Sequence, residues 1–220
     1  MVASEPVKNE KDLVLSNIRA ALGGARTAPP AEGEPAYLIH DDAPREEIVD
    51  RFIERATEYR ALVQRIPAGS ERATIQEALA RRGVQRLAIP TDLPTEWRPD
   101  GIELLIDGDS ALSYQALDEA DGVLTGCACA VAQTGTLILN GGAGQGRRAL
   151  TLLPDYHLCV VLADQIVGLL PEAVRWLAPA TGEHPRPVTF ISGPSATSDI
   201  ELNRVEGVHG PRTLDILVVG

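Results

Sequence analysis

The apolar residues of this 220-residue chain follow two different spacings. Short runs of nearly continuous apolar, often β-branched residues predict buried strands, whereas apolar residues that recur every three or four positions predict amphipathic helices. Strands are expected at residues 62–66, 86–89, 102–106, 122–124, 137–139, 158–162, 188–192 and 214–219. Helices are expected at residues 11–22, 44–60, 71–82, 110–120 and 171–177, with a short one within 195–204.

The alternation of these elements determines the expected fold. Strands that are apolar on both faces and separated by helices are typical of a mostly parallel sheet covered on both sides. We therefore predict an α/β protein, a three-layer α/β/α single domain. The prolines and glycines of residues 23–35 indicate a linker, so residues 1–35 are interpreted as an N-terminal helix with its linker and residues 36–220 as the α/β domain.

Composition and charge narrow the functional classes. A formal net charge of −11 argues against a general nucleic-acid binder, which needs a basic surface. No apolar run approaches the ~18 residues of a membrane span, and the polar start of the chain lacks the apolar core of a signal peptide. Three cysteines are too few for a disulfide framework. These features favour a cytoplasmic protein.

The chemistry of the chain is concentrated in a glycine-rich segment after the strand at 137–139. Residues 141–146 read GGAGQG and are followed directly by Arg147 and Arg148. Glycines allow sharp bends and close backbone approach, and main-chain N–H groups beside guanidinium groups suit an anion. We expect this loop to form the floor of a site for a phosphate or a carboxylate.

Two nucleotide motifs fit the loop poorly. A P-loop requires lysine and a hydroxyl residue where Arg147 and Arg148 stand. A dinucleotide fingerprint can be read from Gly144 to Ala149, with Asp164 as the acidic residue, but Pro154 leaves little room for its helix.

Polar turns elsewhere add candidates for the same site. The Gln-Thr-Gly-Thr turn at 133–136 precedes one strand, and a hydroxyl-rich loop at 192–201 follows another; each is also explained by ordinary turn or capping chemistry. His209, in a second glycine-rich turn, is a candidate acid or base. The candidate ligand-binding residues are Gln133, Thr134, Gly135, Thr136, Gly142, Gly144, Gln145, Gly146, Arg147, Arg148, Ser195, Thr197, Ser198, Asp199, Glu206 and His209.

A metal site is the less favoured interpretation of the sulfur residues. Cys127 and Cys129 are two positions apart, as are His157 and Cys159, so each pair would share one face of a strand and the four would suit zinc. Cysteine is also a common buried residue. Iron–sulfur ligation fits less well, because the chain has no C-x₂-C-x₂-C run. No cofactor is assigned.

Three segments in this order carry a family resemblance. TGCACAVAQTGTLIL, GGAGQGRRALTLLPDYHLCVV and ISGPSATSDIELNRVEGVHGPRTLDILVVG closely resemble the lactate utilisation protein C family, over most of residues 85–220. The resemblance implies a LUD domain with a fold like the NagB/RpiA/CoA-transferase group. It also implies a role in bacterial oxidation of L-lactate to pyruvate, beside companions that carry iron–sulfur clusters. Gln133 stands where relatives often carry an acid; an amide cannot titrate, which disfavours covalent catalysis there.

Two functions remain open at this point. The first is an assisting subunit of a lactate-oxidising complex that binds an anionic ligand and iron–sulfur partner proteins, with the apolar face of the helix at 11–22 as a docking arm. The second is a stand-alone enzyme, similar to CoA transferases or phosphosugar isomerases, that holds phosphate in the loop at 141–148. Its nucleophile would have to come from Asp155, Asp199, Glu201 or Glu206. The resemblance favours the first function.

Overall fold

The computed structural model describes residues 10–22, 37–177, 186–197, 205–206 and 210–220, in two compact units. The units comprise Met1–Tyr37 and Leu38–Gly220. In the first unit, α1 (Glu10–Leu22) is a 13-residue helix, and Leu13, Val14 and Ile18 on it are each about half exposed. All other elements belong to the second unit.

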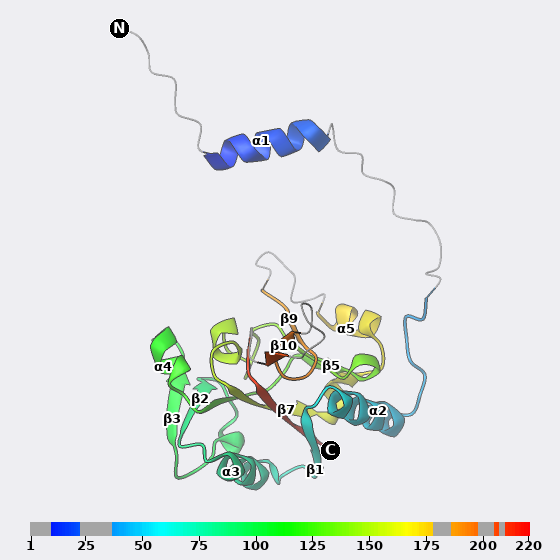
Figure 1. Cartoon of the computed structure of the whole chain (residues 1–220). Coiled ribbons are helices and arrows are strands. Elements are labelled where there is room, and N and C mark those ends of the chain that lie inside the picture. Colours follow the sequence, from blue (N-terminus) through cyan, green and yellow to red (C-terminus); the bar gives the residue numbers. More distant parts are fainter. Residues whose placement is uncertain (1–9, 23–36, 178–185, 198–204, 207–209) are drawn as a thin grey trace. The chain divides into compact units, whose positions relative to one another are not determined.

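A six-stranded sheet is the centre of the second unit (Figure 1). Every neighbouring pair in it is parallel, and its order is β1-β12-β7-β4-β2-β3. The strands are β1 (Leu62–Ile66), β2 (Arg86–Pro90), β3 (Glu103–Asp107), β4 (Gly122–Thr125), β7 (Tyr156–Leu162) and β12 (Thr213–Val219). The central strands β4, β7 and β12 are almost wholly buried, which is why their sequences are apolar on both faces. The predicted parallel α/β sheet is confirmed.

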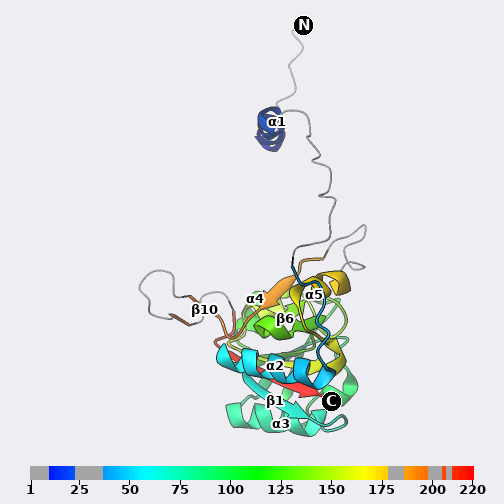
Figure 2. The ribbon, with the colours of Figure 1, turned by 90° about the vertical axis from the view of Figure 1, so that its right-hand side faces the viewer.

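Two helices cover opposite faces of this sheet. Figure 2 shows α2 (Arg45–Glu58) and α3 (Glu71–Arg82) on either side of β1. Phe52 of α2 packs with Cys159 and Ile216 in one core cluster, whereas Ile75 of α3 packs with Leu158 in another. Residues 158 and 159 are adjacent on β7, and side chains of a strand alternate between faces, so one strand serves both clusters.

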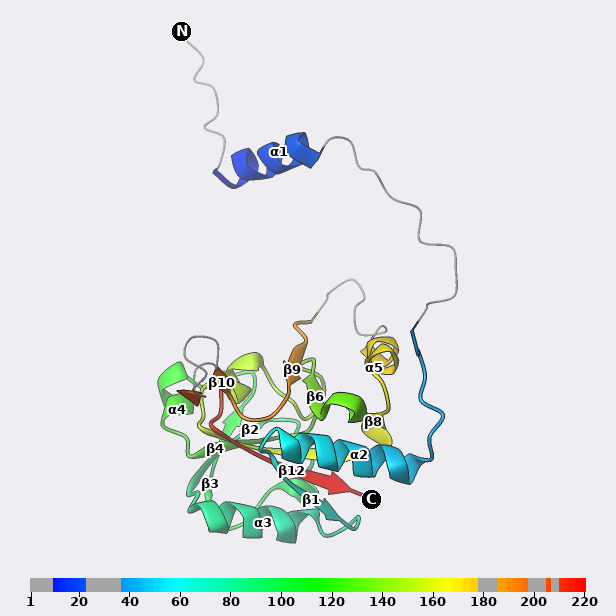
Figure 3. The ribbon, with the colours of Figure 1, turned by 45° about the vertical axis from the view of Figure 1, so that its right-hand side comes forward.

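A second, smaller sheet is a feature that the hydrophobic pattern did not reveal. It has the order β8-β5-β6-β9, with β5 antiparallel to β6 and parallel to β8, and β6 antiparallel to β9. Its strands are β5 (Cys129–Val131), β6 (Thr136–Leu139), β8 (Ile166–Val167) and β9 (Thr189–Ile191). α5 (Leu170–Leu177) packs on it through Ala173 and Leu177. Figure 3 shows α2, β6, β9 and α5 on the side of the large sheet away from α3.

Short elements complete the second unit, and two of them differ from expectation. The helix predicted at 110–120 is limited to α4 (Tyr114–Asp118), because the Leu112 N–H bonds the Asp107 carboxylate and Ser113 caps the helix. The short helix predicted within 195–204 is wrong at its start, where β10 (Ala196–Thr197) pairs with β11 (Val205–Glu206). The 3₁₀ helices are η1 (Thr95–Trp97), η2 (Ala132–Thr134), η3 (Arg148–Thr151) and η4 (Ala163–Gln165).

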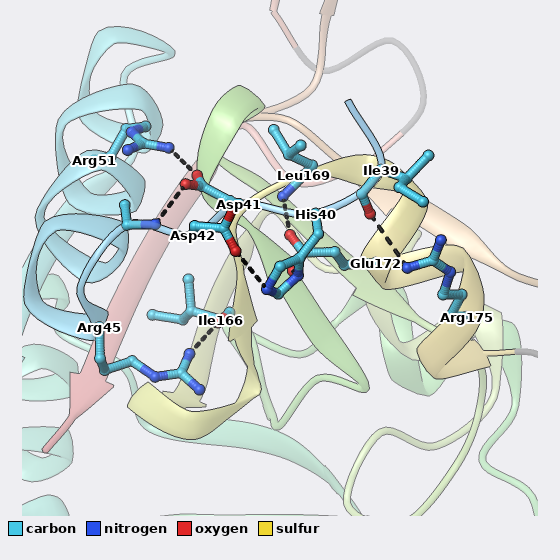
Figure 4. Close-up of polar contacts among 11 residues, drawn as sticks. Ile39, His40, Asp41, Asp42, Arg45, Arg51, Ile166, Leu169, Glu172 and Arg175 are labelled. Carbon is cyan, nitrogen blue, oxygen red and sulfur yellow. Dashed lines mark hydrogen bonds and ion pairs between the residues drawn. The ribbon is translucent and has the colours of Figure 1, made fainter. Parts of the chain in front are cut away.

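The segment before α2 is fastened to α5 and to α2 by polar contacts (Figure 4). His40 Nδ1 lies 2.7 Å from Glu172 Oε1, and Asp41 forms an ion pair with Arg51. Arg45 donates to the Ile166 carbonyl. A shallow hollow of about 350 Å³ lies beside these side chains, and their charged groups are largely paired with one another. This region therefore has a structural role as a strap, residues 38–44.

No helix in the described part of the chain combines the length and the apolar character that crossing a membrane requires.

Candidate functional site

The glycine-rich loop after β6 is an ordered turn rather than an open cradle. Gly141, Gly144 and Gly146 have φ angles of 64°, 68° and 66°, the left-handed region that glycine adopts without strain. The Gly142 N–H donates to Asn140 Oδ1 at 3.0 Å, and buried Gln145 accepts from the Asn140 N–H through Oε1 at 2.7 Å. At least part of the loop's hydrogen-bonding capacity is therefore used internally.

Arg147 is held by a buried carboxylate. Its Nε and Nη2 lie 2.9 and 3.1 Å from the two oxygens of Asp107, and Nη2 also donates to the Leu112 carbonyl at 2.6 Å. The Asp107 side chain is 5% exposed and lies at the carboxyl end of β3. The fork geometry of a guanidinium favours such a two-point pair. Arg147 therefore neutralises Asp107, although it also lines the larger cavity described below.

Arg148 is in a different position. Its Nη1 donates to the carbonyl and hydroxyl oxygens of Thr151, at 2.9 and 3.0 Å, within η3. No carboxylate pairs with it among the residues that the structure describes. Partial burial lowers the pKa of the Arg148 guanidinium, although arginine remains charged at any physiological pH. Arg148 is therefore a positive charge whose remaining N–H groups are available to an anion.

A cavity of about 500 Å³ lies beside Arg148, between the two sheets. The size falls in the usual range for small-molecule sites. Its charged lining comprises the Arg147–Asp107 pair together with Arg148, Arg186 and Asp92. Since the pair cancels, two positive side chains face one negative side chain. Its other lining residues are Pro90, Thr91, Gly108, Leu139, Asn140, Gly141, Gly142, Gln145, Gly146, Thr151, Pro187 and Thr189.

A smaller cavity of about 220 Å³ shares Arg148 and Thr151 with the first. His157 of β7 lines it and is 1% exposed. His157 Nε2 lies 2.8 Å from the hydroxyl of buried Thr125, while Nδ1 has no partner among the described residues. Leaving such a nitrogen unpaired costs about 1–3 kcal/mol, so buried polar atoms without partners are rare. The two cavities and Arg148 between them form the candidate site.

Comparisons with known proteins place this geometry in a family. A lactate utilization protein C from Deinococcus radiodurans is 44% identical over 207 residues, which cover 94% of this chain and 94% of that protein. The chain belongs to the lactate utilization protein C family. A second lactate utilization protein C, from Shouchella clausii, is 27% identical over 97% of this chain and 98% of its own length. The LUD domain model matches residues 111–219, which include both arginines and most of the lining of both cavities.

A solved structure has the same fold. The crystal structure of a DUF162 family protein from Deinococcus radiodurans superposes with a TM-score of 0.71 and 42% sequence identity, covering 81% of this chain and 99% of that one. Membership of the lactate utilization protein C family and the α/β fold with its parallel sheet are thus established together.

Several family-motif residues lie away from the two cavities. Gln133 and Thr134 are exposed on η2, at the end of β6 opposite the glycine-rich loop, and Gly135 packs against α2. Thr136 lies behind the smaller cavity, where its hydroxyl bonds Ser192 Oγ at 2.8 Å. Gln133 therefore lines neither cavity.

The hydroxyl-rich loop is only partly described. Ser195 lines the smaller cavity, while Thr197 and Glu206 lie in the β10–β11 pair. The proposed binding residues Ser198, Asp199 and His209 lie outside the described residues. Of the loop predicted at 141–148, the larger cavity is lined by Gly141, Gly142, Gln145, Gly146, Arg147 and Arg148. Gly144 contributes its carbonyl to the Gly126 N–H at 2.8 Å instead.

The sulfur residues belong to the core. Cys127 and Cys159 pack in the cluster under α2, whereas Cys129 packs in the cluster under α5. The adjacent Cys159 sulfur and burial raise the pKa of the Cys127 thiol, and burial raises that of Cys129 to about 11. Within the described ranges, no three His, Cys, Asp or Glu side chains are grouped to hold a metal ion. The zinc alternative is therefore not supported.

Sequence reasoning missed several lining residues. Thr91 and Asp92 follow β2, and Asp107 ends β3, so all three lie at the carboxyl ends of parallel strands, the edge where α/β proteins bind ligands. That rule could have found them. Arg186 carries no such signal, because its position depends on the pairing of β9 with β6, which the sequence does not reveal. His157 was considered only as a metal ligand.

Proposed function

We propose that this chain is a component of a bacterial lactate utilization system and that it binds a small anionic ligand in the cavity beside Arg148. Membership of the lactate utilization protein C family supports the physiological role. The observation that carries the binding proposal is that Arg148 lines both cavities and has no ion-pair partner in the described part of the chain.

The local charge favours a carboxylate or a phosphate. Arg147 and Asp107 cancel, and Arg148 and Arg186 then outweigh Asp92 in the larger cavity. Bonds to Thr151 fix the orientation of the Arg148 guanidinium, so little side-chain entropy is lost when an anion binds. Hydrogen bonds from a guanidinium to a carboxylate or a phosphate are charge-assisted and roughly twice as strong as those between neutral groups.

We assign the iron–sulfur chemistry of lactate oxidation to partner proteins. A cluster needs several thiolates at one point, whereas the thiols of this chain are divided between two core clusters and those of Cys127 and Cys129 have raised pKa values. The chain then contributes ligand binding and contacts with its partners. Co-purification of the full chain with an iron–sulfur protein from cells grown on L-lactate is the expected result.

A stand-alone phosphate-binding enzyme is the second candidate, favoured by the 500 Å³ volume of the larger cavity and its glycine-rich wall. A CoA-transferase-like mechanism would need a free carboxylate nucleophile there. Asp107 is tied to Arg147 by two bonds, which leaves Asp92. Asp155, considered from the sequence, is exposed and pairs with Arg212 at 3.6 Å.

Calorimetric titration of the full chain with L-lactate, pyruvate and inorganic phosphate tests the binding proposal. Arg148→Ala is expected to weaken binding of the preferred anion by about tenfold or more, because a hydrogen bond to a charged group contributes about 1.5–3 kcal/mol. Arg148→Lys keeps the charge and should lose less. Arg72→Ala removes a half-buried arginine that lines neither cavity and is the matched control.

Growth on L-lactate distinguishes a component of a lactate utilization system from a stand-alone enzyme. A strain without this chain is expected to fail on L-lactate but to grow on pyruvate, and the Arg148→Ala variant should not restore growth. Normal growth on lactate, combined with turnover of an acyl-CoA or a sugar phosphate by the pure chain, would favour the stand-alone enzyme.

A further inference from the structure

The smaller cavity contains a second recognition element. His157 is 1% exposed, and its ring is fixed by the 2.8 Å contact between Nε2 and the Thr125 hydroxyl. Its Nδ1 lacks a partner in the described part of the chain, and His157 lines the cavity that also receives Arg148. A cation and a fixed ring with one unpartnered nitrogen thus border one small space.

We propose that the smaller cavity binds a compact carboxylic acid that carries an oxygen on carbon 2, a 2-hydroxy or 2-oxo acid. Arg148 holds the carboxylate, and His157 Nδ1 bonds the oxygen on carbon 2. The inference rests on the proposed function, because Arg148 is the same anion-binding residue. It adds His157 as the residue that distinguishes oxygenated acids from plain ones.

The rest of the lining fits this class of ligand. Phe190, Ile191, Pro194, Pro211 and Leu214 supply apolar surface for a short alkyl group, and Ser192 and Ser195 supply hydroxyls. The volume of about 220 Å³ lies below the ~300–1,000 Å³ of sites for larger ligands. A phosphate ester carries more charge than the single arginine of this cavity would balance, so it suits the larger cavity better.

The direction of the His157–Thr125 hydrogen bond decides between the two acids. If the Thr125 hydroxyl donates to Nε2, the ring proton is on Nδ1, which then donates to a carbonyl or a hydroxyl oxygen. If Nε2 carries the proton, Nδ1 is an acceptor and bonds only a hydroxyl, as in a 2-hydroxy acid. Comparing L-lactate with pyruvate therefore reports the tautomer.

Titration of the full wild-type chain with L-lactate, pyruvate and propionate tests the inference, because propionate lacks the oxygen on carbon 2. Lactate or pyruvate is expected to bind about tenfold more tightly than propionate, the effect of one buried hydrogen bond. The double variant Thr125→Val/His157→Phe, which preserves volume and leaves no hydroxyl unpaired, should bind all three within about twofold. His157→Gln, which keeps a hydrogen-bonding group, should restore part of the difference.

A second measurement does not depend on the variants folding. In ¹⁵N-histidine NMR spectra of the wild-type chain, which has four histidines, the ring signal of His157 should shift on adding lactate or pyruvate but not propionate. Equal binding of lactate and propionate, both weakened by Arg148→Ala, would overturn the role of His157 and leave the proposed anion site intact. Failure of lactate, pyruvate, propionate and phosphate to bind at all would overturn both.

Discussion

Two adjacent arginines in this chain have different roles because only one of them, Arg147, pairs with a buried carboxylate. Arg147 lies 2.9 Å from Asp107 and is one-third exposed, whereas Arg148 turns away and bonds Thr151. The backbone at Arg147 is extended and the 3₁₀ helix η3 starts at Arg148, so the two side chains leave the chain in different directions. Adjacency in sequence therefore does not imply a shared ligand.

This difference predicts that removing Arg147 lowers the stability of the fold more than removing Arg148. Arg147→Ala leaves Asp107 buried without a counter-charge and should lower the free energy of unfolding by roughly 2–3 kcal/mol. Arg148→Ala removes no ion pair and should lower it by less than about 1 kcal/mol. Urea unfolding followed by circular dichroism measures both. Equal losses from the two substitutions would show that Arg148 also holds the fold together.

Asp41 makes the strap sensitive to acid. The Ala43 N–H and the Arg51 guanidinium lower the pKa of the Asp41 carboxyl below its usual value. A carboxyl whose folded pKa is depressed stabilises the fold above its unfolded pKa, near 3.9, and that contribution disappears as pH falls through the folded pKa. Wild type should therefore exceed Asp41→Asn in unfolding free energy at pH 6, and the difference should shrink below about pH 4. A difference independent of pH between 6 and 3 would contradict this origin.

At the scale of elements, regular strands could be predicted and irregular ones could not. β1 was expected at its observed bounds, and β2, β3 and β12 within about one residue, because short segments rich in apolar residues between helix and turn signals indicate strands. β5 was missed because it has only three residues within a segment rich in alanine and cysteine, and β8 has only two residues. These short strands acquire their structure from the sheet they join, which local sequence does not specify.

The candidate site is subject to the same limitation: local sequence indicates single residues but not their partners from distant strands. The glycine-rich loop and Arg148 could be identified because their residue types are unusual in themselves. The pairing of Arg147 with Asp107 joins residues 40 positions apart, and the contact of His157 with Thr125 joins residues 32 apart. Such partners depend on strand order, so a sequence reading could not assign them.

The Gln-Thr-Gly-Thr turn has a structural role that predicts its response to substitution. Gly135 has a φ of 60°, and a Cβ there would lie 2.6 Å from the Arg55 carbonyl carbon in α2. Gly135→Ala should therefore cost more than about 2 kcal/mol, since strain and a backbone clash combine.

Gly83 provides the matched control for this prediction. It ends α3 with a φ of 68°, but a Cβ there would meet nothing within 4 Å. Gly83→Ala should cost only the roughly 1 kcal/mol of the left-handed conformation. Thermal unfolding measures the stability of both variants. Similar losses of stability would mean that α2 shifts to accommodate the new Cβ without a free-energy cost.

At the scale of the whole molecule, the folded core and the candidate site both belong to the second unit. The buried clusters are formed by residues between Ala43 and Val219, and both cavities by residues between Pro90 and Leu214. The apolar residues of α1, in contrast, remain about half exposed. Stability and ligand binding should therefore be properties of the second unit, and we expect the apolar face of α1 to contact a partner instead.

Removing residues 1–37 tests this division of roles. Because no core residue is lost, the melting temperature of residues 38–220 should stay within about 2–4 °C of the full chain, the change that 1 kcal/mol produces at this size. Affinity for the preferred anion should be unchanged, since every lining residue is kept. Co-purification with an iron–sulfur protein should decrease if the apolar face of α1 is the contact. A melting temperature lowered by 10 °C or more would instead mean that the first unit supports the fold, because its apolar residues would then have to be buried against the second.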